Sequence, residues 1–133
     1  MLLNLSNHEA ARWSAAQKQT VAERFDDVRD LPFPPIAPNA DLASVTALAQ
    51  KYVAQCQDLL KAADPARSAI HIMGEMTFVY QFVQQATAAG LRCVASTTER
   101  LAVDHPDGTK TSEFRFVRFR DYDTRNGLLH TAN

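Results

Sequence analysis

A chain of 133 residues with a formal net charge of −1 is long enough for one domain around a single core. Hydrophobic residues make up 46% of the chain and charged residues 22%, which excludes a disordered or fibrous protein. Because the charge is nearly balanced, the chain lacks the basic field that holds duplex nucleic acid. An anionic ligand would therefore be a small one, bound by a few donors in a pocket.

The first half of the chain alternates strand and helix signals. Residues 1–5 form a short apolar run, and Ser14 followed by Gln17 has the spacing of a capping box, which predicts a helix from 14 to about 25. Residues 27–33 give a weak strand signal, and the prolines that follow place it at a sheet edge and predict a stiff crossover loop. Apolar residues at helical spacing then predict a helix from 41 to about 62.

The second half continues this alternation and then changes. We expect a strand at 68–74, a helix over 75–90 that Gly90 ends, and a strand at 91–97. Residues 100–122 indicate two further strands joined by a turn at Asp107-Gly108, with either a bulge at Phe116-Val117 or apolar groups on both faces. The sequence thus predicts an α/β fold: a Rossmann-like, mainly parallel sheet with helices on both faces and a C-terminal β-hairpin. Residues 1–123 form the single domain, and 124–133 are expected to be a disordered tail.

The two cysteines and the first residues of the sequence indicate in which cellular compartment we expect the protein. Cys56 and Cys93 have no CxxC spacing, and no cysteine and histidine cluster has metal-ligand spacing, so we expect buried thiols, no metal and no cofactor. The start lacks the basic residues of a signal peptide, and no apolar run is long enough to span a membrane. These features predict a cytoplasmic protein without a membrane partner.

Polar residues follow three of the predicted strands. In an open parallel sheet, ligands bind beyond the carboxyl ends of the strands, where the strand order reverses, and an order of 2-1-3-4 would bring the first and third ends together. The three polar segments are Ser6, Asn7 and His8; Gly74, Glu75 and Thr77; and Ser96, Thr97, Thr98 and Arg100. The sequence therefore predicts a pocket with Ser6, Asn7 and His8 as one wall.

Each segment also has a plain structural interpretation. His8 is suited to proton transfer near neutral pH, or it holds a neighbouring loop. Gly74 and Glu75 begin a helix that can receive an anion, or Glu75 stabilises the positive end of the helix dipole. Arg100 can clamp a phosphate beside three hydroxyl groups, or it pairs with a surface carboxylate.

The remaining histidines and the hairpin have ordinary interpretations. His71 lies inside an apolar strand and is expected to be a hydrogen-bonded core residue, whereas His105 and His130 are expected in loops. The hairpin alternates arginine with aromatic residues, which can bind single-stranded nucleic acid but more often packs aromatics into a core or a dimer partner.

Five segments together resemble a known family. "LLNLSNH" with Trp13, "DLPFP", "GEMTF", "VASTTER" and "DGTK…FRFVRFRDY" are similar to small CRISPR-associated proteins encoded beside type III systems, related to the CARF-like binders of cyclic oligoadenylate that include ring nucleases. The resemblance implies a homodimeric CARF-like domain that binds a cyclic oligoadenylate, with cyclic tetra-adenylate the expected ring. It also implies cleavage without metal by attack of a 2′-hydroxyl on the adjacent phosphate, which would switch off type III CRISPR signalling.

The resemblance assigns roles to the residues at the strand ends. The expected catalytic residues are His8, Glu75 and Arg100. The expected ligand-binding residues are Ser6, Asn7, Gly74, Thr77, Ser96, Thr97, Thr98 and Lys110. Because the three segments contain no lysine, charge stabilisation would rest on Arg100, helix dipoles and Lys110 or a hairpin arginine. Two alternatives remain open: a non-catalytic sensor or sponge for the same ligand, and a phosphate-ester enzyme unrelated to CRISPR signalling.

Overall fold

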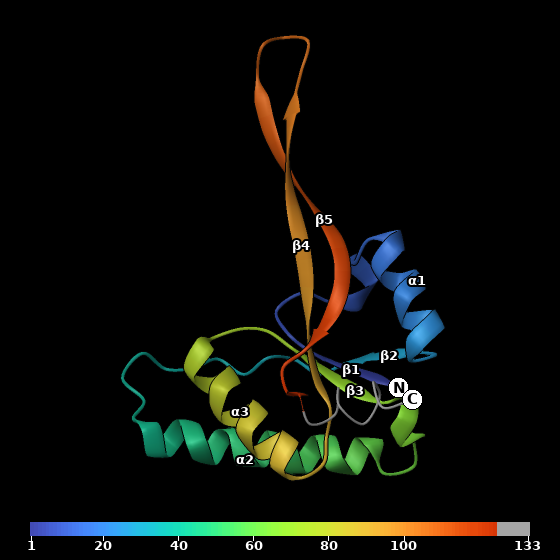
Figure 1. Cartoon of the computed structure of the whole chain (residues 1–133). Helices are drawn as coiled ribbons and strands as arrows, with labels where there is room; N and C mark the ends of the chain where they lie inside the picture. The colour runs from blue at the N-terminus through green and yellow to red at the C-terminus, as the bar shows by residue number, and fades with distance from the viewer. Residues whose placement is uncertain (125–133) are drawn as a thin grey trace.

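The computed structural model describes residues 1–124, which form a five-stranded sheet in the order β2-β1-β3-β4-β5 (Figure 1). The strands are β1 (Leu2–Leu5), β2 (Val28–Asp30), β3 (Ala69–Ile72), β4 (Cys93–Asp104) and β5 (Lys110–Asp121). The first four strands run parallel and β5 runs antiparallel to β4. The predicted α/β fold with a mainly parallel sheet and a C-terminal hairpin is confirmed.

The helices lie where the apolar periodicity places them. They are α1 (Ala15–Arg24), α2 (Leu42–Leu60) and α3 (Met76–Ala88), with short 3-10 turns η1 (Ala10–Arg12) and η2 (Pro65–Arg67). The Ser14 hydroxyl accepts a hydrogen bond of 3.2 Å from the Gln17 amide, which confirms the predicted helix start. Gly90 has a φ of +85° just beyond α3, the left-handed conformation that ends a helix at little cost for glycine. In the described part of the chain no helix is long and apolar enough to cross a membrane.

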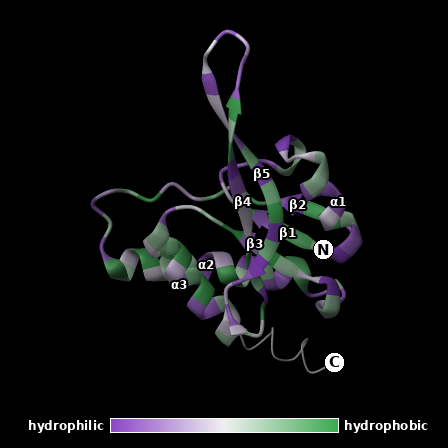
Figure 2. Cartoon of the chain, turned by 45° about the horizontal axis from the view of Figure 1, so that its top comes forward, coloured by the Kyte–Doolittle hydropathy of each residue, from purple (hydrophilic) through white to green (hydrophobic). Residues whose placement is uncertain are grey.

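The sheet is covered on both faces because its short strands alternate their side chains between two cores. Leu3 and Ile70 pack with α2 and α3 on one face, in a cluster that includes Phe78. Leu2 and Val94 pack on the other face with α1. Figure 2 shows hydrophobic residues concentrated in the central sheet and largely hydrophilic residues at the tip of the hairpin.

β4 differs from the prediction. We expected separate strands at 91–97 and about 100–105, but residues 93–104 form one continuous strand that leaves the sheet and pairs with β5 in a hairpin extending far from the helices (Figure 1). Within the polar run Ser96–Arg100, residues 98–100 are exposed and have no core beneath them, so the sequence there shows no alternating pattern. Backbone pairing with β5 holds it as a strand instead.

The predicted bulge is present in β5. Thr97 is paired with Arg118 and Thr98 with Phe116, so Val117 is the extra residue. The insertion turns Phe116 and Phe119 toward the same face, where their ring centroids lie 5.1 Å apart. The predicted tail begins at Thr124, and its remaining residues, 125–133, lie outside the described part of the chain, as does His130.

Candidate functional site

A row of polar side chains crosses three neighbouring strands. The sheet register pairs Asp30 with Asn4 and Asn4 with His71, so the three residues lie side by side on β2, β1 and β3. His71 is in turn paired with Val94, and Ser96 follows two positions later on β4. Residues two apart on a strand share a face, so Ser96 lies on the same face as His71.

These side chains are joined by short hydrogen bonds. The Asn4 Nδ2 donates to Asp30 Oδ1 and to the His8 carbonyl oxygen, each at 2.8 Å. Asn4 Oδ1 lies 2.9 Å from His71 Nδ1 and accepts a hydrogen bond of 2.8 Å from Ser6 Oγ. His71 Nε2 lies 3.1 Å from Ser96 Oγ. A continuous chain of contacts therefore runs from Asp30 at the edge of the sheet to Ser96 on β4.

His71 is a buried core residue, as predicted. Its ring meets those of Trp13 and Phe119 edge to face, at centroid distances of 5.2 and 5.6 Å, and the centroids of these two rings lie 6.1 Å apart. Burial, and to a lesser degree the nearby His8, lowers the pKa of His71 to about 4. The imidazole is therefore neutral at neutral pH, and it can accept or donate hydrogen bonds but carries no charge.

A pocket of about 350 Å³ opens above this row of hydrogen-bonded side chains. Its lining includes Ser6, Asn7 and His8 from the end of β1, Met73 and Gly74 from the end of β3, and Ser96 and Thr98 from β4. Because β1 is paired with β3, the predicted neighbourhood of the first and third strand ends is confirmed. The pocket lies where the strand order reverses, which is the usual binding position of a doubly wound sheet.

The loop after β1 is rigidly held. The Ser6 hydroxyl lies 3.2 Å from the His8 carbonyl oxygen and accepts a hydrogen bond of 3.3 Å from the His8 amide. Together with the bond from Asn4 to the same carbonyl, these contacts fix the backbone at His8. Asn7 and His8 are exposed, so their side chains are presented at the pocket mouth from a fixed support.

The residues after β3 have a structural explanation. Glu75 is the N-cap of α3, accepts hydrogen bonds from the amides of Thr77 and Phe78, and also contacts the Thr77 hydroxyl. These hydrogen bonds, that from the Thr77 side chain foremost, lower the pKa of Glu75. A β-carbon at Gly74 would overlap the ring of Phe33, so the glycine makes room for that ring. Neither Glu75 nor Thr77 lines the pocket beside Ser96.

The basic residues predicted for the site lie along the hairpin. Arg100 is four positions beyond Ser96, about 13 Å farther along the strand, and its Nε donates to Ser112 Oγ at 3.1 Å. Lys110 begins β5 and its Nζ lies 3.9 Å from Asp104 Oδ1, with both side chains exposed. Thr97 donates from its hydroxyl to the Arg118 carbonyl oxygen at 3.1 Å. The structure thus does not bring these three side chains into the pocket of one chain, and their proposed roles stay predictions.

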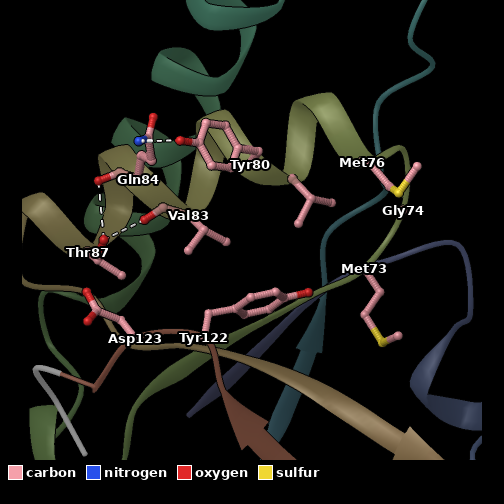
Figure 3. Close-up of a pocket in the computed structure, with 10 residues that line it drawn as sticks. Met73, Gly74, Met76, Tyr80, Val83, Gln84, Thr87, Tyr122 and Asp123 are labelled. Atoms are coloured by element: carbon pink, nitrogen blue, oxygen red, sulfur yellow. Dashed lines mark hydrogen bonds between the residues drawn. The ribbon is translucent and has the colours of Figure 1, made fainter.

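A second, larger pocket of about 690 Å³ lies between α3 and the end of β5 (Figure 3). Its lining is largely apolar, with Met76, Tyr80 and Val83 of α3 facing Tyr122. The Tyr122 hydroxyl is engaged at 2.6 Å with the Ile72 carbonyl oxygen, and burial raises its pKa. We regard the smaller pocket as the candidate site, because polar side chains from the loop after β1, from His71 of β3 and from Ser96 and Thr98 of β4 converge on it.

Sequence reasoning missed Asp30, Asn4 and His71 as parts of this site. A signal was present: an asparagine in "LLNL" and a histidine in "AIHI" are the single polar residues of two short apolar strands. Adjacent parallel strands of equal length place such residues beside each other, but only the register establishes it. Among residues 1–124 no group of three or more histidine, cysteine or acidic side chains is placed to hold a metal.

The fold and the pocket together define a doubly wound α/β domain with a hydrogen-bonding pocket at its topological switch point. A family model described as "Uncharacterized protein MJ1673 family" matches residues 1–120, and the chain belongs to this family. No curated protein and no solved structure matches the chain.

Proposed function

We propose that this protein is a metal-independent ring nuclease that binds a cyclic oligoadenylate, cyclic tetra-adenylate in the first place, and opens its ring. The observation that supports the proposal is the convergence of Ser6, Asn7, His8, Ser96 and Thr98 around one pocket at the switch point. Hydroxyl, amide and imidazole groups suit a ligand made of ribose, phosphate and base edges. In this proposal the protein acts in the cytoplasm, and buried free thiols at Cys56 and Cys93 agree with a reducing compartment.

The proposed reaction requires the protein mainly to position the 2′-hydroxyl against the adjacent phosphate. The 2′-oxygen forms a bond to the adjacent phosphorus, the bond from phosphorus to the 5′-oxygen breaks, and a linear product with a 2′,3′-cyclic phosphate results. The 2′-hydroxyl loses its proton and the 5′-oxygen gains one, so one acid and base group at the pocket suffices. His8 is the group we assign to this role, because its side chain is exposed at the pocket and its backbone is fixed.

The size of the pocket favours a second copy. At about 350 Å³ it lies near the lower limit for ligand pockets, so one chain encloses only part of a cyclic oligonucleotide. Phe114 and Val117 on the protruding hairpin are 70% and 55% exposed, which suits burial against a second chain. In such a homodimer, Arg100 and Lys110 of each hairpin become available to the ring held by both copies.

Product analysis tests the proposal directly. Purified protein is incubated with cyclic tri-, tetra- and hexa-adenylate in EDTA, and the products are separated and weighed by mass spectrometry. We expect linear fragments with a 2′,3′-cyclic phosphate. His8→Ala should abolish cleavage while His105→Ala, which removes an imidazole near the hairpin turn, should not. An intact ring that remains bound would indicate a sponge, and absence of binding would refute the proposal.

The proposed dimer is tested separately, by measuring the mass of the protein in solution. Light scattering at micromolar concentration should give twice the 14.8 kDa of one chain. Phe114→Ser should shift the mass toward one chain, whereas Leu42→Ser, at an equally exposed residue on α2, should leave it unchanged. A wild-type mass of one chain in the presence and absence of the ring would exclude the shared site.

A further inference from the structure

The donor and acceptor of each hydrogen bond beneath the pocket can be assigned. The assignment begins at Asn4, whose side chain faces two groups that can only accept. Asn4 Nδ2 lies 2.8 Å from both Asp30 Oδ1 and the His8 carbonyl oxygen. A carboxylate and a carbonyl oxygen only accept, so the amide nitrogen of Asn4 must face them. Asn4 is 1% exposed. Rotating its side-chain amide by half a turn would place Oδ1 against two other acceptor oxygens, without water to compensate.

The orientation of Asn4 fixes the tautomer of His71. Asn4 Oδ1, which only accepts, lies 2.9 Å from His71 Nδ1, so Nδ1 carries the hydrogen of the neutral ring. The lone pair then lies on Nε2, 3.1 Å from Ser96 Oγ. Burial keeps His71 neutral, with a pKa of about 4, so no second hydrogen occupies Nε2 at neutral pH.

The last step sets the character of Ser96. Its hydroxyl has one hydrogen, and an imidazole nitrogen is a far better acceptor than the Met73 sulfur, which lies 3.2 Å away. The hydrogen therefore points to His71, below the pocket. Ser96 is half-buried and lines the pocket, so the lone pairs of Oγ are what a ligand meets.

We propose that Ser96 is a dedicated hydrogen-bond acceptor in the pocket and that it recognises the ribose 2′-hydroxyl of the ligand, with His71 and Asn4 as positioning residues. The identity of the ligand rests on the proposed function. In the bound ligand an acceptor at this point holds the 2′-hydroxyl beside phosphorus; its hydrogen turns to His8 when the proton is removed, and the 2′-oxygen then attacks. His71 is not the base, because a proton on Nε2 would create a charge among Trp13 and Phe119.

The test compares two ligands on three proteins. Cyclic tetra-adenylate and its 2′-deoxy-2′-fluoro analogue, which lacks the hydroxyl hydrogen, are titrated into wild type, Ser96→Ala and the control Ser44→Ala, which removes an exposed hydroxyl on α2 outside the pocket. Titrations are run at 4 °C, with product analysis to verify that the ring stays intact. We expect wild type and Ser44→Ala to prefer the ribose ring by roughly 3- to 10-fold, the value of one hydrogen bond. Ser96→Ala should bind both rings with nearly equal affinity.

The possible results separate the two proposals. If wild type binds neither ring, the proposed function fails and this inference fails with it. If wild type binds the ribose ring but Ser96→Ala keeps the full preference for it, or if wild type shows no preference, the ligand function stands and the role of Ser96 is refuted. His71→Asn adds an independent readout, since asparagine keeps a donor for Asn4 but frees the Ser96 hydrogen, and it should also lose the preference.

Discussion

Buried, neutral His71 makes the stability of the fold depend on pH in a defined direction. Its pKa is about 4 in the folded chain and about 6.5 in an unfolded one. Between these values the unfolded chain binds more protons than the folded chain, so stability rises with pH. The contribution is fully present above pH 6.5 and is lost as the pH falls toward 4.

The size of the loss follows from the two pKa values. A difference of about 2.5 pH units corresponds to about 3 kcal/mol at full titration. At pH 5 the folded ring is still largely neutral while the unfolded ring is protonated, and the loss relative to pH 7.5 is about 2 kcal/mol. For a domain of this size, whose total stability is of the order of 10 kcal/mol, such a loss is easily measured.

Urea unfolding at pH 7.5 and pH 5.0 measures this loss, with His71→Asn as the control. The variant lacks the titrating ring but keeps a donor for Asn4, and every other residue is common to both proteins. Wild type should therefore lose about 2 kcal/mol more than the variant between the two pH values. Equal losses would refute the reasoning and mean that His71 takes up its proton in the folded chain.

Three further changes test the packing around the site by urea unfolding. Phe119→Ala should lower the free energy of unfolding by roughly 3–5 kcal/mol, because the ring is 4% exposed. Phe114→Ala, at a ring that is 70% exposed, should change it by less than about 0.5 kcal/mol when the protein is dilute enough to be monomeric. Equal effects of the two substitutions would contradict the assigned core. Gly74→Ala should cost about 1–3 kcal/mol through the ring of Phe33, and adding Phe33→Leu should recover part of it; no recovery would refute that contact. Deleting Val117 removes the bulge but leaves Phe116 and Phe119 two positions apart on the same face, so Phe119 stays in the core, and the deletion should destabilise far less than Phe119→Ala; an equally large loss would contradict the register.

Local signals were sufficient for most of the fold. The cap at Ser14, the left-handed glycine at Gly90 and the apolar period of α2 each depend on a few neighbouring residues, and each prediction is confirmed. The strand order also followed from general rules of doubly wound sheets. The predicted division of β4 was wrong because its middle has no core to impose a pattern.

The candidate site was predictable only at its rim. Ser6, Asn7 and His8 follow a recognisable strand end, so their place at the pocket could be predicted. The link between Asn4 and His71 could not, because it joins positions 67 residues apart and depends on which residues the register of β1 and β3 pairs. A shift of one residue would turn one of the two toward the opposite core and leave it without a partner.

The position of Arg100 limits what a single chain can do to a phosphodiester. The pocket lining offers hydroxyl groups, amides and histidines, and it includes no lysine or arginine from residues 1–124. A developing charge on phosphate oxygens is stabilised most strongly by cations and preorganised donors in a closed site. Arg12 and Lys18 are sequence neighbours of the lining residues Trp13 and Gln17, but both are exposed and Lys18 Nζ donates to the Ala11 carbonyl oxygen at 2.8 Å. Arg100 lies on the hairpin, which extends away from its own sheet. If the chain is the ring nuclease that we propose, the hairpin of a second copy would supply further cations to the ring, and we expect an isolated chain to cleave more slowly than a dimer.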